Sequence, residues 1–317
     1  MRRAEIAAFL AVVAVLLLLP ELGARQPYIL HMLVLTGLYA IPAIGLNLML
    51  GYTGLVSLGH AALAGIGGYA VAILTVDARL NFWLALPLAA AASAVAGILI
   101  GALCLRLRTH FFMIVTLAFG LILHAVMNNS DAVTRGAAGF AGIPRPDAIA
   151  LGFTTIGFRS LVEFYRLTVV AVAVVFAIQA LLVRSQFGGV LSTLRQDETL
   201  AAFKGVNPTS YKIAVFAIGS ALAGIGGALE VSYLRVAAPS SFDMLESINL
   251  VLIVIVGGAG YLLGPLLGAL LFVGIPEYLR VASEYRLIVF GLILVLVTLF
   301  ARQGLAGLLR WRRAQTP

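Results

Sequence analysis

Long apolar runs, separated by short polar segments, constrain the fold of this chain more than any other feature of its sequence. Most of the runs approach the roughly 20 residues that a helix needs to cross about 30 Å of hydrocarbon. A backbone in lipid must satisfy its own hydrogen bonds, so it spans either as helices or as a closed barrel. The runs are far longer than the roughly ten alternating residues of a barrel strand. Helices are therefore predicted near residues 6–19, 28–50, 58–75, 82–104, 111–128, 165–183, 211–231, 247–276 and 286–300.

Composition also favours lipid over water as the solvent of this chain. Of 317 residues, 62% are hydrophobic and 11% are charged, whereas about 25% of the residues in a soluble domain are charged. The net charge of +8 comes from Lys and Arg residues scattered between the apolar runs, which fits orientation in a membrane better than a nucleic-acid surface. We expect an all-α polytopic membrane protein, one transmembrane domain over residues 1–317, with roughly 8–10 membrane segments of which one or two are broken or re-entrant.

The basic residues predict the orientation of the chain. Cytoplasmic loops carry an excess of Lys and Arg. If Arg2 and Arg3 are cytoplasmic, the basic C-terminal tail lies on the same side only when the block 247–276 turns back instead of crossing once. Both termini are therefore expected in the cytoplasm, with a break at Gly264 and Pro265. The glycines at positions 260, 264 and 268 are equally compatible with a straight packing face.

The segment 45–74 is the first that could carry transport. A helix that ends near Leu50 meets Gly51 and Gly54, and a second helix is expected to start near Ser57, a good N-cap residue. Interrupted helices at membrane depth are tolerated where they line a cavity. An ordinary turn at the cytoplasmic surface would also explain the pattern. The polar candidates for a translocation pathway here are Asn47, Thr53, Ser57 and His60.

A second candidate lies at the outer end of the predicted span 111–128. His124, Asn128 and Asn129 could form a polar mouth for a solute, or bond to headgroups and to loop backbone. A connection of residues 129–164 follows them. Its glycines, prolines and mixed charges predict a structured outer loop.

The inner connection, residues 184–210, is the third candidate. Good helix formers follow Gly189, Gly205 suits a C′ position, and Asn207-Pro208 suits the start of the next span. A short helix over 189–205 is therefore predicted across the inner face. Such a helix can dock a soluble partner and transmit rigid-body motion to the attached spans. The candidate coupling residues are Arg195, Asp197, Glu198, Ala202 and Gly205.

No catalytic, metal-binding or nucleotide-binding pattern is present in the sequence. The four histidines are dispersed, without an HExxH spacing. A P-loop needs Gly-Lys-Ser/Thr, yet the two lysines, Lys204 and Lys212, precede Gly205 and Ile213. The single Cys104 cannot form an intramolecular disulfide. We therefore expect no enzyme activity and no bound cofactor or metal, and any ATP must act on another polypeptide.

Several segments resemble LivM-type permeases of the branched-chain amino acid ABC importer family. Residues 194–229 resemble the cytoplasmic coupling segment of that family, and residues 45–63 its N-terminal signature. FFMIVTLAFG followed by GIPRP, the Gly-rich stretch 257–268 and FARQGLAG resemble further family segments, so the resemblance spans about residues 40–307. The chain departs from the family pattern at Leu55, where glutamine is usual, at Gly189, where a basic residue is common, and at Arg135-Gly136, where two glycines are usual.

The resemblance implies a permease subunit in the bacterial cytoplasmic membrane that forms half of a pathway for a branched-chain or related amino acid. It implies three kinds of partner besides lipid, namely a sister permease in a heterodimer, two cytoplasmic ATPases and a periplasmic or extracellular solute-binding protein. Residues 129–164 would then receive the binding protein, and residues 189–205 would dock on an ATPase. The alternative is a self-sufficient secondary transporter or channel for a small polar solute. Such proteins usually need ionisable residues within their spans, and here Glu230 and His124 are the nearest.

Overall fold

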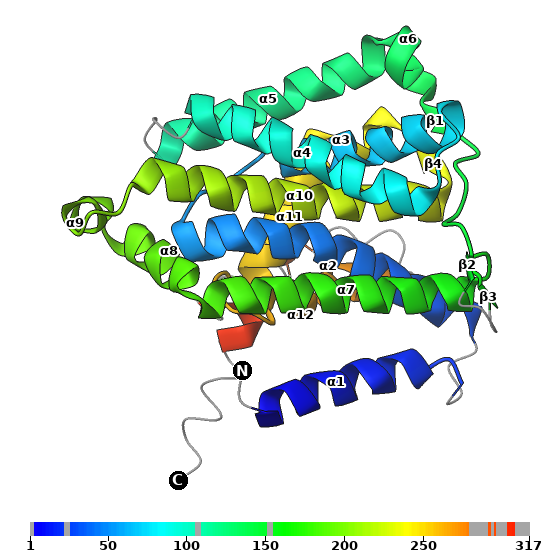
Figure 1. Ribbon diagram of the computed structural model, residues 1–317, viewed down its shortest axis with the longest axis horizontal. Coiled ribbons are helices and arrows are strands. Elements are labelled where there is room, and N and C mark those ends of the chain that lie inside the picture. Colours follow the sequence, from blue (N-terminus) through cyan, green and yellow to red (C-terminus); the bar gives the residue numbers. More distant parts are fainter. Residues whose placement is uncertain are drawn as a thin grey trace.

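The chain folds into one bundle of helices that run side by side across the view in Figure 1. The computed structural model describes residues 3–21, 26–104, 109–150, 155–278, 291–292, 295 and 303–307. Within these ranges the elements are α1 (Arg3–Leu18), α2 (Pro27–Thr53), α3 (His60–Ala72), the π-turn η1 (Ile73–Asp77), α4 (Phe82–Cys104), α5 (Thr109–Asn129), α6 (Asp131–Thr134), η2 (Gly136–Ala138), β1 (Phe140–Ala141), β2 (Ile149–Ala150), β3 (Thr155–Ile156), α7 (Leu161–Arg184), α8 (Gln186–Gln196), α9 (Glu198–Phe203), α10 (Pro208–Leu234), β4 (Val236–Ala237), η3 (Pro239–Phe242), α11 (Met244–Gly257) and α12 (Gly264–Tyr278).

The all-α polytopic architecture is confirmed. In the described part of the chain, seven helical segments are long and apolar enough to cross a membrane, and two shorter apolar helices, Phe9–Leu18 and Gly264–Pro276, accompany them. The predicted span 286–300 and the basic tail lie outside the described residues, apart from 291, 292 and 295 in that span. The seven long segments are Pro27–Thr53, His60–Asp77, Phe82–Cys104, Phe111–Asn129, Leu161–Arg184, Pro208–Leu234 and Pro239–Gly257.

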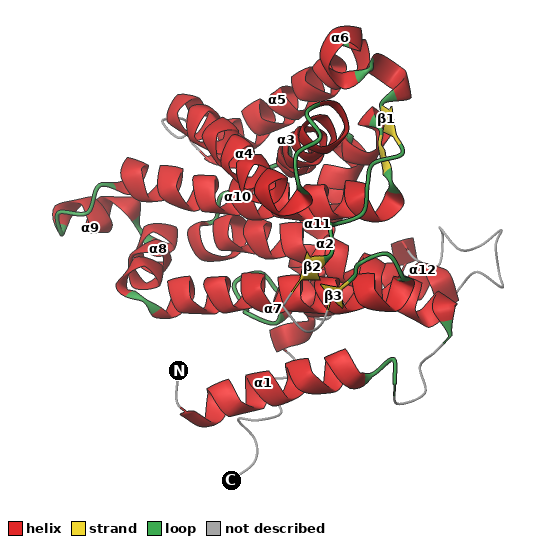
Figure 2. Cartoon of the chain, turned by 45° about the vertical axis from the view of Figure 1, so that its right-hand side comes forward, coloured by secondary structure: helices red, strands yellow, loops and turns green. Residues whose placement is uncertain are grey.

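The two ends of the bundle differ in structure. At one end, on the left of Figure 1, lie the short helices α8 and α9, and we call this the α9 end. At the other end, the β1 end, the described residues of the predicted loop 129–164 include α6, η2 and short strands. The β1 strand pairs antiparallel with β4, Phe140 opposite Ala237, and β2 pairs with β3. Figure 1 places these strands at the β1 end, and Figure 2, turned by 45°, brings β2 and β3 to the front of the bundle.

The helix α10 is the centre of the bundle, because it packs against α2, α3 and α4. Small residues allow these helices to approach closely, as in many membrane bundles. A Cβ atom at Gly67 on α3 would overlap the backbone of Gly224 on α10, and one at Gly227 would overlap the backbone of Ala64. By contrast, α1 lies at the edge of the bundle against α7, where the Tyr165 hydroxyl donates to the Leu16 carbonyl at 3.0 Å.

Candidate functional site

The interruption between α2 and α3 penetrates the bundle. The helix α2 ends with Gly54 in the left-handed conformation (φ +76°), and α3 begins only at His60. The predicted restart at Ser57 is wrong, because Gly59 is the N-cap residue. Tertiary contact explains the difference: the Thr116 hydroxyl accepts a 3.2 Å hydrogen bond from the Leu58 amide and keeps this segment extended. The α3 helix therefore starts beside Pro42, in the interior of α2, to whose carbonyl oxygen His60 Nε2 lies at 3.0 Å.

The polar candidates of this segment are buried in helix contacts. The Thr53 hydroxyl donates to the Met49 carbonyl at 2.6 Å. Asn47 joins α2 to the turn after α11: its Nδ2 donates to the Tyr261 carbonyl at 3.0 Å and its Oδ1 accepts from the Gly260 amide at 2.9 Å. Ser57 Oγ and His60 Nδ1 are buried and have no hydrogen-bond partner within the described residues. Asn47 therefore holds α2 to the turn after α11, and His60 holds the start of α3 to α2.

Asn128 and Asn129 lie apart from that cluster, at the β1 end of α5. Both are exposed. Asn129 Nδ2 donates to the Ala125 carbonyl at 2.8 Å, one turn earlier in the same helix. The structure therefore does not bring the two groups of predicted pathway residues together.

The block 247–276 is a helical hairpin. The helix α11 ends at Gly257, and α12 begins with Gly264 and Pro265. Pro265 occupies the first turn, where its missing N–H costs no helical hydrogen bond. The small-residue spacing also serves packing, because a Cβ atom at Gly268 would overlap the backbone of α11, and one at Gly264 would overlap the backbone of Gly258, the residue after α11. The break and the packing face are thus both present in one hairpin.

The inner connection forms two helices, where the sequence predicted one. The helix α8 stops at Gln196, and Asp197 takes an extended conformation as the N-cap of α9, where Oδ1 accepts from the Thr199 and Leu200 amides at 2.8 and 3.0 Å. The continuous helix 189–205 is therefore wrong at Asp197. The C′ position of Gly205 (φ +81°) and the N-cap position of Asn207 are confirmed.

This pair of helices is bonded to two long helices of the bundle. Arg195 on α8 donates through Nη1 to the carbonyl of Gly51, near the end of α2. Glu198 on α9 forms an ion pair with Lys212 on α10, whose side chain is 7% exposed. A displacement of α8 and α9 would therefore act on α2 and α10 directly. Arg195 and Glu198, predicted as contacts for a partner, here bond to their own chain.

The outward surface of α9 carries apolar side chains that sequence inspection missed. Phe203 is 85% exposed and Leu200 is 49% exposed. Ala202 lies between them and is exposed as well. A phenylalanine at the end of a predicted helix gives no sign of its exposure in the sequence, because apolar residues there are usually buried. These residues form an exposed apolar surface on α9, which we call the α9 surface.

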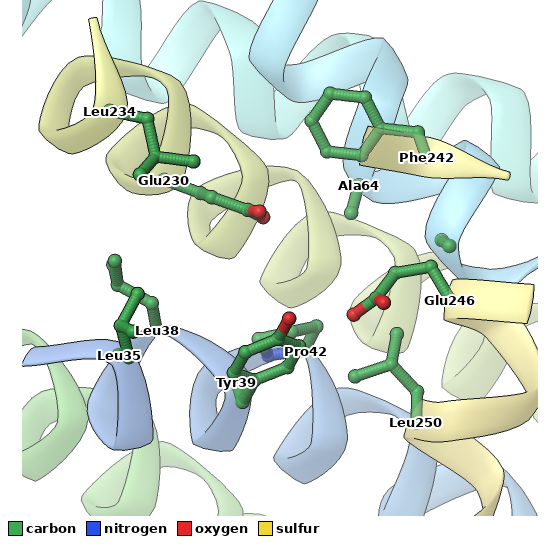
Figure 3. Close-up of a pocket in the computed structure, with 11 residues that line it drawn as sticks. Leu35, Leu38, Tyr39, Pro42, Ala64, Glu230, Leu234, Phe242, Glu246 and Leu250 are labelled. Carbon is green, nitrogen blue, oxygen red and sulfur yellow. The ribbon is translucent and has the colours of Figure 1, made fainter. Parts of the chain in front are cut away.

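A cavity of about 80 Å³ lies near the β1 end, and Figure 3 shows the side chains that line it. The carboxylates of Glu230 on α10 and Glu246 on α11 and the hydroxyl of Tyr39 on α2 point into it from different helices. Carboxylates within apolar spans are a signal that can be read in a sequence. That these two face the same cavity depends on the packing of both α10 and α11 against α2. The remaining lining residues are Leu35, Leu38, Pro42, Ala61, Ala64, Leu234, Phe242 and Leu250.

Comparison with known proteins identifies the family of this chain. Residues 28–298 match the family described as the permease component of the branched-chain amino acid transport system. The high-affinity branched-chain amino acid transport system permease protein LivM of Salmonella typhimurium is 34% identical over 87% of this chain and 69% of that protein, and LivM of Escherichia coli K12 is 33% identical over the same shares. The ribose import permease protein RbsC of Escherichia coli K12 is 27% identical over 83% of this chain and 82% of that protein. No solved structure matches the chain.

Proposed function

This chain belongs to the family of permease components of branched-chain amino acid transport systems, and from this premise we propose that it is a permease subunit of an ATP-binding-cassette importer. It would form half of the pathway for a branched-chain or related amino acid, with a sister permease as the other half. Two ATPase subunits would supply the energy, and a solute-binding protein would deliver the solute at the β1 end. The relatives include a ribose permease, so they support transport by the chain more strongly than they support one solute.

The observation that carries this proposal is the α9 surface together with the bonds that α8 and α9 make to the bundle. An apolar surface on a short helix suits a groove on a soluble partner. Glu198 ties α9 to α10, and Arg195 ties the adjoining α8 to α2. A movement of a bound ATPase would therefore displace α2 and α10, the helices next to the interruption after Gly54.

The proposal assigns the α9 end to the cytoplasm. In the described chain this end carries Arg184, Arg195, Lys204 and Lys212. Cytoplasmic connections are enriched in such residues, and an ATPase is reachable only from that side. Both chain termini are then proposed to be cytoplasmic.

A secondary transporter is the second candidate function, and one observation favours it. Two carboxylates, Glu230 and Glu246, meet within the spans, where such proteins place groups that couple to protons or ions. The two candidates differ in their source of energy, so one experiment separates them.

That experiment is uptake of tritiated L-leucine into liposomes. With the sister permease, both ATPases and the binding protein present, uptake is expected only when ATP is supplied on the ATPase side. The chain alone is expected to give no uptake under a proton or sodium gradient. Gradient-driven uptake by the chain alone would contradict the importer and establish the secondary transporter.

Replacing Phe203 by glutamate tests the α9 surface. Because this side chain is 85% exposed, the melting temperature of the permease should not change. An aromatic anchor at an interface contributes about 2 kcal/mol or more, so affinity for the ATPase should fall about 30-fold. Co-purification of permease and ATPase at graded concentrations measures this.

Two controls accompany Phe203→Glu. Phe203→Leu keeps an apolar anchor and should retain most of the affinity. Val133→Glu adds the same charge to an exposed residue of α6, at the β1 end, and should leave ATPase binding unchanged. Equal ATPase binding by Phe203→Glu and wild type would remove the α9 surface from the proposal.

A further inference from the structure

The cavity at Glu230 combines apolar walls with acidic groups. Leucine, alanine, proline and phenylalanine side chains line most of it, and none of its lining residues is basic. The oxygens of Glu230, Glu246 and Tyr39 face one another across the space, from three different helices (Figure 3). A pocket with apolar walls and a few convergent polar groups is the usual form of a small-molecule site.

No positively charged side chain among the cavity's lining residues neutralises the carboxylates of Glu230 and Glu246. Glu246 Oε2 accepts one hydrogen bond, from Asn249 Nδ2 at 3.2 Å, and its carboxylate interacts with the Tyr39 hydroxyl. Glu230 has no hydrogen-bond donor and no cation beside it in the described chain, and Glu246 adds repulsion from the same charge. Ionisable groups within a bilayer are costly unless they are paired. A cation in the cavity would supply the missing partner.

The size and the chemistry of the cavity select the kind of cation. Water occupies about 30 Å³ per molecule, so about 80 Å³ accommodates an ammonium group and its first carbon atoms. An ammonium group has three N–H donors, and three acceptor residues converge here. A hard divalent cation such as Ca²⁺ prefers six to eight oxygen ligands, which leucine-rich walls do not offer.

We propose that this cavity binds the protonated amino group of the transported solute, with Glu230 and Glu246 as its acceptors and Tyr39 beside them. The inference rests on the proposed function, since it takes an amino acid as the solute. The apolar walls contributed by Leu38 and Leu250 then contact the alkyl part of the solute that follows the ammonium group. The sugar permeases among the relatives carry a solute without an ammonium group, so the acidic pair would distinguish this chain from them in specificity.

The test measures direct binding to the whole complex in lipid nanodiscs, without the binding protein, by scintillation proximity with tritiated L-leucine. Two leucine fragments serve as competitors: 3-methylbutylamine lacks the carboxylate, and 4-methylpentanoate lacks the amino group. We expect the amine to displace leucine and the acid to leave it bound. Glu230→Gln should weaken leucine binding at least tenfold, because it removes a charge-assisted hydrogen bond.

Two further variants keep the test decisive. Glu21→Gln makes the same chemical change at an exposed ion pair with Arg166 and should bind like wild type. If Glu230→Gln does not fold, as judged by its melting temperature, Tyr39→Phe takes its place, and it should weaken binding about threefold or more by removing one polar contact.

Three outcomes would overturn the inference. They are no saturable leucine binding by the wild-type complex, equal displacement by the amine and the acid, and unchanged binding by a folded Glu230→Gln or, where that variant does not fold, by Tyr39→Phe. Each of these leaves ATP-dependent uptake by the wild-type complex as a separate measurement. Failure of that uptake would refute the importer, whereas failure of the binding test alone would refute only the amine site.

Discussion

Replacement of Glu198 by arginine is expected to abolish ATP-driven uptake while the helix bundle remains folded. Glu198 pairs with the buried Lys212 of α10 and so holds α9 against the central helix. An arginine at that position would set two cations against each other, and α9 would separate from α10. The bundle tolerates the change because Lys212 lies in the second turn of α10 and can extend its ammonium group to water.

The measurements for this prediction are uptake in liposomes and permease–ATPase co-purification. Uptake should fall below detection, and association should weaken. The exchange Glu198→Lys with Lys212→Glu restores opposite charges and should recover part of both, the coupling that a double-mutant cycle isolates. Glu21→Arg, which disrupts an exposed ion pair at the β1 end, serves as control and should transport normally. Normal uptake by Glu198→Arg would exclude this ion pair from coupling.

Valine in place of Gly67 is expected to prevent the bundle from assembling. The first side-chain carbon would overlap the backbone of Gly224, and backbone cannot move aside as a side chain can. The helices α3 and α10 would have to separate, and the neighbouring contact of Ala64 with Gly227 would be lost with them. Overpacking of this kind costs about 3 kcal/mol or more, a large part of the stability of a typical domain.

A matched control separates this packing effect from helix propensity. Valine is a better helix former than glycine, so propensity alone would stabilise the variant. Gly189 on α8 has open space around its Cα, and Gly189→Val should melt at or slightly above the wild-type temperature. Gly67→Val should give little monodisperse protein in detergent, with Gly67→Ala intermediate. Equal melting temperatures for Gly67→Val and wild type would show that the two helices are not in this close contact.

The sequence was sufficient for features that depend on neighbouring residues. Apolar runs of spanning length predicted the helices, and Asn207-Pro208 and Gly205 predicted where α10 starts and α9 ends. Asp197 was misassigned although its signal is local, because a short polar side chain can either sit within a helix or cap the next one. Here capping prevails, since Oδ1 satisfies two backbone amides.

Features that depend on distant residues could not be predicted. The extended segment continues beyond Ser57 because Thr116, on another helix, bonds to it. Asn47 looked like a pathway residue, yet its partners, Gly260 and Tyr261, are more than 200 positions away. The same holds for Glu230 and Glu246, whose meeting requires that α10 and α11 pack against a common face of α2. The sequence showed which side chains are polar, but it did not show which distant residues they would contact.

The contact between Gly67 and Gly224 also limits how this sequence can diverge. A larger residue on one helix is usually accommodated by a smaller one on the other, but both positions already hold the smallest residue. No compensating exchange is left, so these two positions should stay glycine in descendants of this gene that keep the same helix spacing. Leu99 and Ile122, whose side chains are exposed on the bundle, have no such restriction within this chain and should exchange more freely among apolar residues.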